Sequence, residues 1–148
     1  MKRLLIVIGL MVATGGMVVV LASAFNLHER LKRHEESVQC GNIMCSIGCV
    51  AVMWANDDKH TNLPSDLISM SNELVIPRIL ICPGDHSRRP AASWASFTTN
   101  DSSYEIVTPG LRAWDSNGVF LRCKIHGHLG YGDATVFDGE RRRTKVFQ

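Results

Sequence analysis

A short stretch near the C-terminus combines side chains that bind metal ions. Cys123, His126 and His128 follow one another with C-x2-H-x-H spacing, and Asp133 comes five residues after His128. Sulfur, imidazole and carboxylate groups are zinc ligands, so this stretch suggests a metal site formed by His126, His128 and Asp133. Calcium is an alternative metal, although the ordered oxygen ligands of an EF-hand loop are missing. The simpler interpretation, which we adopt as the expectation, is a structural use of the histidines in a Gly-rich turn with no cofactor.

The cysteines suggest a disulfide. The chain has five cysteines, and Cys82 and Cys123 each end a segment that we expect to be a β-strand. A bond between them would close a loop of about 40 residues, contribute roughly 3–4 kcal/mol and persist only in an oxidising compartment. Two free buried thiols are the alternative, because connectivity does not follow from sequence. Cys45 and Cys49 are four residues apart on an expected helix, which is too far for a bond, and Cys40 has no evident mate.

Sequence motifs of known catalytic sites are missing. His28-Glu29 followed by His34 resembles HExxH, but histidines six residues apart on a helix point about 120° apart and do not share a metal. The sequence also lacks a nucleophile elbow, a P-loop and a dinucleotide fingerprint. A small thiol or metal hydrolase is a third possibility that needs a free Cys123 beside His126. We expect no enzyme and no small-molecule substrate. The net charge of +2 argues against a nucleic-acid partner.

The elements that must position these residues begin with an apolar N-terminal block. Of the 22 residues from Leu4 to Phe25, 17 are apolar and none is charged. As a helix this block would extend about 33 Å and cross a hydrocarbon core of roughly 30 Å. It therefore predicts a transmembrane anchor over residues 1–26. A cleaved signal peptide is the alternative, because Ala22-Ser23-Ala24 offers a cleavage site after Ala24.

An amphipathic helix at about residues 27–57 is expected next, because no proline interrupts the chain before Asn56. Apolar residues at helical spacing predict its buried face: Leu27, Leu31, Ile43, Ile47, Val50 and Trp54. Gly41 and Gly48 either weaken this helix by about 1 kcal/mol each or allow a close neighbour. A short helix over 65–70 and strands over 78–82, 104–107, 119–122 and 130–137 are expected to follow. This order predicts an α+β fold in which residues 27–148 form one domain.

Several segments, taken in order, resemble bacterial type IV pilins and type II secretion pseudopilins. The likeness covers roughly residues 40–136 and includes Trp54-Ala55-Asn56-Asp57, Cys82-Pro83-Gly84-Asp85 and His126-Gly127-His128. The residues that carry the family motif are Asn42, Trp54, Asn56, Asp57, Pro83, Asp85, Tyr104 and Gly127. The chain is a divergent relative in this comparison, because the family's Gly-Phe-Thr-Leu-Ile-Glu processing motif is absent.

The resemblance implies a long helix, half in the membrane, whose amphipathic half packs on a small antiparallel sheet, with Cys82 and Cys123 as the family's cysteine pair. It also implies a non-enzymatic, membrane-anchored, pseudopilin-like structural subunit of a type II secretion or pilus-like assembly. The expected partners are the membrane and other pseudopilin or secretion-apparatus subunits. The expected location is the inner (cytoplasmic) membrane, spanned once, with the C-terminal domain outside the cytoplasm. The alternative is a secreted domain, released after Ala24, that binds a metal at His126, His128 and Asp133.

Overall fold

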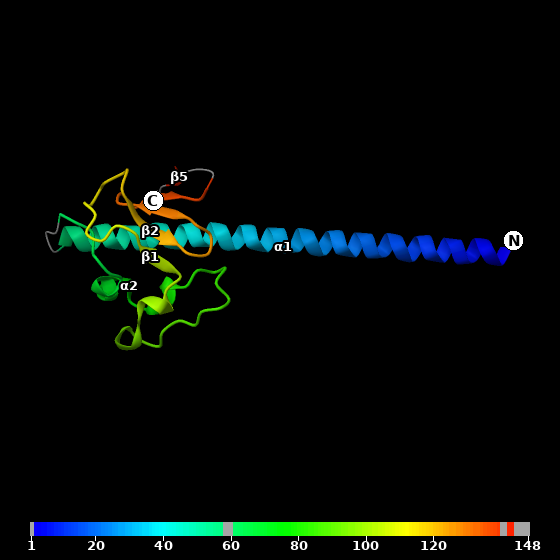
Figure 1. Cartoon of the computed structure of the whole chain (residues 1–148), viewed down its shortest axis with the longest axis horizontal. Coiled ribbons are helices and arrows are strands. Elements are labelled where there is room, and N and C mark those ends of the chain that lie inside the picture. Colours follow the sequence, from blue (N-terminus) through cyan, green and yellow to red (C-terminus); the bar gives the residue numbers. More distant parts are fainter. Residues whose placement is uncertain (1, 58–60, 140–141, 144–148) are drawn as a thin grey trace. The chain divides into compact units, whose positions relative to one another are not determined.

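Helix α1 (Lys2–Asp57) is the first and longest element of the chain (Figure 1). The computed structural model describes the backbone of residues 2–57, 61–139 and 142–143. The chain divides into two units, Met1–Glu35 and Glu36–Gln148, and we call the second unit the head. The predicted continuation of one helix to about residue 57 is confirmed. The absence of proline accounts for this, since glycine weakens a helix without removing its hydrogen bonds.

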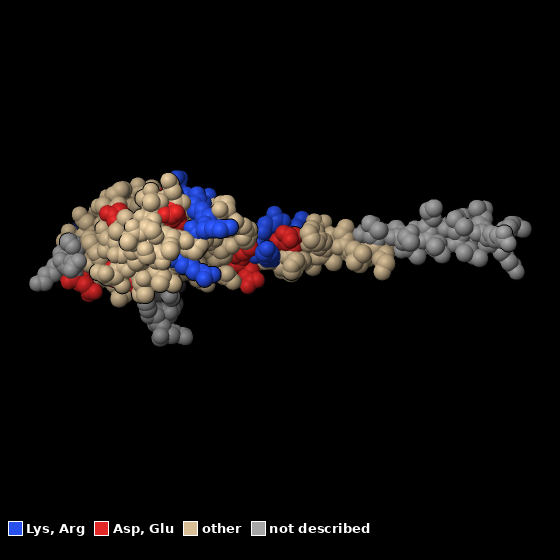
Figure 2. Space-filling view, turned by 90° about the horizontal axis from the view of Figure 1, so that it is seen from below, with Lys and Arg blue, Asp and Glu red and all other residues tan. Residues whose placement is uncertain are grey.

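In the unit Met1–Glu35, the described side chains of α1 are first uncharged and then include Lys, Arg and Glu (Figure 2). Met17 and Leu21 are 67% and 61% exposed, and charged side chains follow from Glu29. By length and composition, α1 is the one helix in the described part of the chain that is able to cross a membrane. Leu27 and Leu31 are also exposed, so the prediction that the buried face starts at Leu27 is wrong.

Within the head, the buried face of α1 consists mainly of small and sulfur-containing side chains. Its members are at most 1% exposed and recur every three or four residues: Cys40, Met44, Ile47, Ala51 and Ala55. The other predicted members of this face, Ile43, Val50 and Trp54, are partly buried and pack against the core from its margins. A Cβ atom on Gly48 would lie 3.0 Å from the Cα of Ala134. Gly48 therefore allows a close neighbour, which is one of the two alternatives predicted for it.

A small antiparallel sheet packs against this face of α1 (Figure 1). Its strand order follows the sequence through β1 (Tyr104–Ile106), β2 (Val119–Cys123), β3 (Leu129–Tyr131), β4 (Val136–Phe137) and β5 (Arg142–Arg143). Tyr104 is paired with Cys123, and Glu105 is paired with Arg122, whose Nε donates to Glu105 Oε1 at 2.6 Å. Phe120 and Leu121 are each 1% exposed and complete the core. The α+β architecture, and strands near 104–107 and 119–122, are thus confirmed.

Two strand predictions are corrected by the structure. Residues 78–82 do not form a strand, because Pro77 starts the 3-10 helix η2 (Pro77–Leu80) with a φ angle suited to a helical first turn. The segment 130–137 is divided into β3 and β4 by a turn in which Ala134 has a φ of 62°. The remaining short helices are η1 (Ile68–Met70), α2 (Ser71–Leu74), η3 (Trp94–Ser96) and η4 (Thr99–Asp101). The predicted helix over 65–70 corresponds to η1, and its start is stabilised by a hydrogen bond from the Ser69 N–H to Asp66 Oδ1 at 2.8 Å.

Candidate metal centre

Three segments of the head bring four metal-ligating side chains together. Cys40 lies on the buried face of α1, Cys82 follows η2, and Cys123 ends β2. His126 lies in the turn that leaves β2 and is half-buried. The three sulfur atoms and one imidazole nitrogen all lie within 4.8 Å of one another. The cysteines are at most 1% exposed, so three thiols and an imidazole converge inside the head. We call these four residues the Cys3His cluster.

Cys82 begins the tight turn Cys82-Pro83-Gly84-Asp85. The backbone N–H of Asp85 donates to the carbonyl of Cys82 at 2.8 Å, and the N–H of Gly84 donates to the Cys82 sulfur. His126 Nδ1 lies 3.2 Å from Cys82 Sγ. A Cβ atom on Gly84 would come within 2.9 Å of Cε1 of His126. Glycine at this position therefore leaves the space that the imidazole occupies.

Cys123 begins a second turn in which backbone donors face a sulfur atom. The N–H groups of Ile125 and His126 each lie 3.4 Å from Cys123 Sγ. The N–H of Gly127 donates to the Cys123 carbonyl at 3.0 Å, and Gly127 has a φ of 70°, which glycine adopts at no steric cost. Donors directed at sulfur favour the thiolate form over the thiol. Both turns thus direct backbone N–H groups at the sulfur atoms of their cysteines.

The thiols of the cluster share this charge unequally. Hydrogen bonds from Cys40 and Cys82, together with the backbone N–H groups of the second turn, lower the pKa of Cys123. The hydrogen bond to Cys123 raises the pKa of Cys40, and burial adds to this shift. The corresponding hydrogen bond from Cys82 to Cys123 also raises the pKa of Cys82. The hydrogen bonds within the cluster thus favour the thiolate form of Cys123 over those of Cys40 and Cys82.

Further contacts hold the ligating side chains in place. The Tyr104 hydroxyl donates to Cys40 Sγ at 3.7 Å, and burial raises the pKa of Tyr104, so this hydroxyl remains protonated. The His128 ring is stacked on the His126 ring, with 5.3 Å between ring centroids. His128 Nε2 in turn lies 3.1 Å from the Ser37 hydroxyl of α1. Such contacts fix the orientation of ligands around a metal.

Asp85 connects the first turn to the sheet. Its carboxylate is buried, forms an ion pair with Arg88, and accepts hydrogen bonds from the hydroxyls of Ser87 and Ser103, each at 2.7 Å. Burial alone would raise the pKa of Asp85, but these hydrogen bonds outweigh it and hold the pKa well below its ordinary range. Because Ser103 directly precedes β1, the carboxylate fixes the Cys82 turn against the strand that pairs with Cys123.

The structure corrects the predicted disulfide. No disulfide is formed among the residues that the structure describes, and Cys40, Cys82 and Cys123 are free thiols. Cys82 and Cys123 lie in one site with the sulfur of Cys40 and the imidazole of His126, which corresponds to the alternative of two free buried thiols. Sequence reasoning missed Cys40. Its spacing of four from Met44 on a helical face, and the odd number of cysteines, were the available signals.

The three residues predicted as metal ligands have different positions. His126 belongs to the Cys3His cluster, whereas His128 is stacked on its ring. Asp133 lies in the turn after β3, where its Oδ1 accepts hydrogen bonds from the Thr135 N–H at 3.0 Å and from the Thr135 hydroxyl at 2.6 Å. Asp133 thus has a clear local role in shaping that turn, and the metal-ligating cluster that the structure presents is built on cysteine.

The chemistry of the donors distinguishes what the Cys3His cluster is able to do. Thiolate and imidazole ligands suit zinc, whereas calcium requires oxygen ligands. A thiol hydrolase needs a nucleophile within reach of a substrate, but Cys123 is 0% exposed. The arrangement therefore fits a closed structural metal site better than a reactive thiol.

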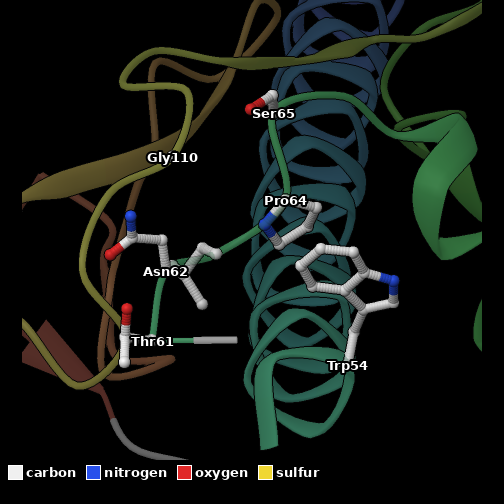
Figure 3. Close-up of a pocket in the computed structure, with 7 residues that line it drawn as sticks. Trp54, Thr61, Asn62, Pro64, Ser65 and Gly110 are labelled. Carbon is white, nitrogen blue, oxygen red and sulfur yellow. The ribbon is translucent and has the colours of Figure 1, made fainter. Parts of the chain in front are cut away.

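A surface hollow near the C-terminal end of α1 is a separate feature of the head (Figure 3). Trp54 and Pro64 lie on one side of it, and Gly110 approaches from a later turn. The Leu63 N–H donates to the Leu111 carbonyl at 2.7 Å, so pairing between two loop segments forms its wall. Among the described residues, those that line the hollow are uncharged.

Three of the residues on which the resemblance in sequence was based lie at the cluster. Tyr104 contacts Cys40, Asp85 anchors the Cys82 turn, and Gly127 closes the Cys123 turn. Comparisons of the chain with protein-family models, with curated proteins and with solved structures found no match.

Proposed function

We propose that this chain is a non-enzymatic, membrane-anchored structural subunit of a type II secretion or pilus-like assembly. One observation carries the proposal: α1 supplies both an uncharged apolar stretch and the buried face of a small α+β head. An apolar helix of this length matches the thickness of a bilayer. The pilin-like order of motifs between residues 40 and 136 supports the same role.

Lipid and other subunits are the partners in this proposal. Met17 and Leu21 present exposed apolar surface in the unit Met1–Glu35, and such side chains are stable in hydrocarbon or against similar helices. The charged residues from Glu29 onward suit the lipid headgroups and water that border the hydrocarbon. The protein would cross the inner membrane once, with its head outside the cytoplasm.

A structural role agrees better with the head than a catalytic role does. Cys123, the cysteine with the lowered pKa, is fully buried, and its neighbours Cys40 and Cys82 are equally inaccessible. Groups in such positions stabilise a fold but do not reach a substrate.

Two paired substitutions test the anchor. We expect Met17→Arg with Leu21→Arg to release the full chain from carbonate-washed bacterial membranes, because each arginine costs about 2.5–3.5 kcal/mol near the middle of a bilayer and less towards its surface. Leu27→Arg with Leu31→Arg is the matched control, since these residues have the same spacing of four and similar exposure but lie beside charged residues. The control should stay in the membrane fraction. Equal release of both variants, or of neither, would contradict the anchor.

Two further measurements test processing and assembly. Intact mass of the membrane-bound protein should show a chain that starts upstream of the apolar block. A start at Phe25 would contradict the anchor and favour the released-domain alternative. Crosslinking in native membranes should capture other pilin-like or secretion subunits, and isolated copies alone would count against assembly.

A further inference from the structure

The Cys3His cluster is the feature of the head that the proposed function leaves without a role. We propose that Cys40, Cys82, Cys123 and His126 bind one Zn2+ ion that joins α1 to the sheet. This inference does not depend on membrane anchorage, because all four residues belong to the head. It also differs from the site suggested by sequence alone, which lacked the three sulfur ligands.

The geometry of the cluster is close to that of bound zinc. Tetrahedral zinc with sulfur at about 2.3 Å and nitrogen at about 2.0–2.1 Å separates its ligand atoms by about 3.6–3.8 Å. The four ligand atoms lie within 4.8 Å of one another, and Cys82 Sγ is 3.2 Å from His126 Nδ1. Shifts of about 1 Å or less would therefore place all four on a tetrahedron, which small side-chain rotations supply.

The surroundings of the sulfurs suit a zinc–thiolate site. Three thiolates and one neutral imidazole around Zn2+ leave a single net negative charge, which is costly to bury without donors. The N–H groups of Gly84, Ile125 and His126 supply such donors to Cys82 and Cys123. The remaining sulfur, on Cys40, accepts the Tyr104 hydroxyl. Each sulfur of the proposed site thus already has a hydrogen-bond donor.

A metal ion would bind all four side chains of the cluster, whereas a disulfide would involve only two of them. A bond between Cys82 and Cys123 would leave the Cys40 thiol and the His126 ring beside it, inside the head. Zinc binds all four groups, and Cys3His is an established ligand set for structural zinc. The ion would link residues from the start, middle and end of the head, which are contributed by α1, the Cys82 turn and β2.

Metal content of the full chain is the first test. The protein is purified in detergent with a reductant and without a chelator, and zinc is measured by elemental mass spectrometry. We expect about one zinc ion per chain. Replacement of zinc by Co2+ should give the visible absorption of tetrahedral cobalt with sulfur-to-cobalt charge transfer. Absence of zinc, together with no Co2+ spectrum in the reduced protein, would overturn the proposal.

Substitutions then identify the ligands. Cys40→Ser is the most informative, because neither the disulfide nor the site at His126, His128 and Asp133 involves Cys40. It should lower zinc affinity by about 100-fold or more, beyond the 10- to 100-fold loss typical of an outer contact. Cys45→Ser is the matched control, since Cys45 is buried on the same helix but lies outside the cluster. The control should retain zinc.

A conservative substitution distinguishes zinc loss caused by removal of a ligand from zinc loss caused by misfolding. His126→Cys creates a four-cysteine set, which also binds structural zinc, so the chain should keep its metal while the cobalt spectrum shifts towards four thiolates. Retention of zinc by Cys40→Ser together with its loss from Asp133→Ala would overturn the proposed ligand set. A Cys82–Cys123 disulfide in protein analysed directly from cells, with no metal uptake after reduction, would also overturn it.

Discussion

Gly48 of α1 lies against the turn between β3 and β4, and its replacement by alanine tests the packing of the head. A Cβ atom at this position would lie 3.0 Å from the Cα and 3.2 Å from the Cβ of Ala134. These atoms belong to the backbone or are attached directly to it, so they cannot rotate away. Gly41→Ala is the matched control on the same helix, because its new Cβ would meet its nearest neighbour, His128 Nδ1, only at 4.0 Å.

The expected magnitude comes from two opposing contributions. Both substitutions gain about 1 kcal/mol of helix propensity. Only Gly48→Ala introduces a steric overlap, and overpacking of this kind costs about 1–3 kcal/mol. Gly41→Ala should therefore raise the free energy of unfolding by about 1 kcal/mol, whereas Gly48→Ala should leave it unchanged or lower it by up to about 2 kcal/mol.

Urea unfolding of the full chain in detergent, followed by near-ultraviolet circular dichroism, measures this difference. Because the helix-propensity gain is shared, the difference between the two variants reports the steric cost alone. Ala134→Gly in the Gly48→Ala background should recover part of the loss, since it removes one overlapping atom and relieves a φ of 62°. Equal stabilisation by Gly41→Ala and Gly48→Ala would refute the close packing of α1 on the turn.

Two further predictions concern the turn that carries Cys82. The pKa of Asp85 is lowered in the folded head, so its stabilisation is present above the ordinary value of 3.8 and is lost as the pH falls below it. Asp85→Asn should lower the free energy of unfolding by about 1.5–3 kcal/mol at pH 7. This difference should begin to shrink as the pH falls below 3.8 but should still be largely present at pH 3, because the lowered pKa of Asp85 lies well below that pH, and urea titrations at pH 7 and pH 3 measure it. Gly84→Ala should displace the His126 ring and lower zinc affinity by about 10- to 100-fold, as measured by competition with a chelator. An unchanged affinity would contradict the placement of His126 over Gly84.

The outline of the fold was predictable because it depends on local signals. The absence of proline predicted the continuation of α1, and the predicted strands over 104–107 and 119–122 correspond to β1 and β2. The exact buried face of α1 was not predictable in the same way. Apolar periodicity favoured Ile43, Val50 and Trp54, but the sheet packs on a neighbouring face of small residues such as Ala51. Close packing on small side chains is a tertiary effect that hydrophobicity alone does not reveal.

The candidate site was only partly predictable for a similar reason. The spacing of Cys123 and His126 indicated metal chemistry, and Cys82 was correctly expected near Cys123. Cys40, however, is separated from these residues by long stretches of chain, and only the packing of α1 on the sheet brings it to them. The segment before Cys82 was misread as a strand because an apolar run has no periodicity that distinguishes a buried strand from a short helix.

The strand order of the sheet has a consequence for how the protein is made. Each strand pairs with the strand that precedes or follows it in sequence, so the hairpins require only short loop closures. The packing contact between Gly48 and Ala134, in contrast, joins an early segment of the head to a late one. We therefore expect the strands of the sheet to pair with one another before the sheet packs on α1. During synthesis, the apolar face of the sheet, which includes Leu121 and Val136, would be exposed until the sheet packs on α1. This face would be the surface most prone to aggregation and most in need of a chaperone.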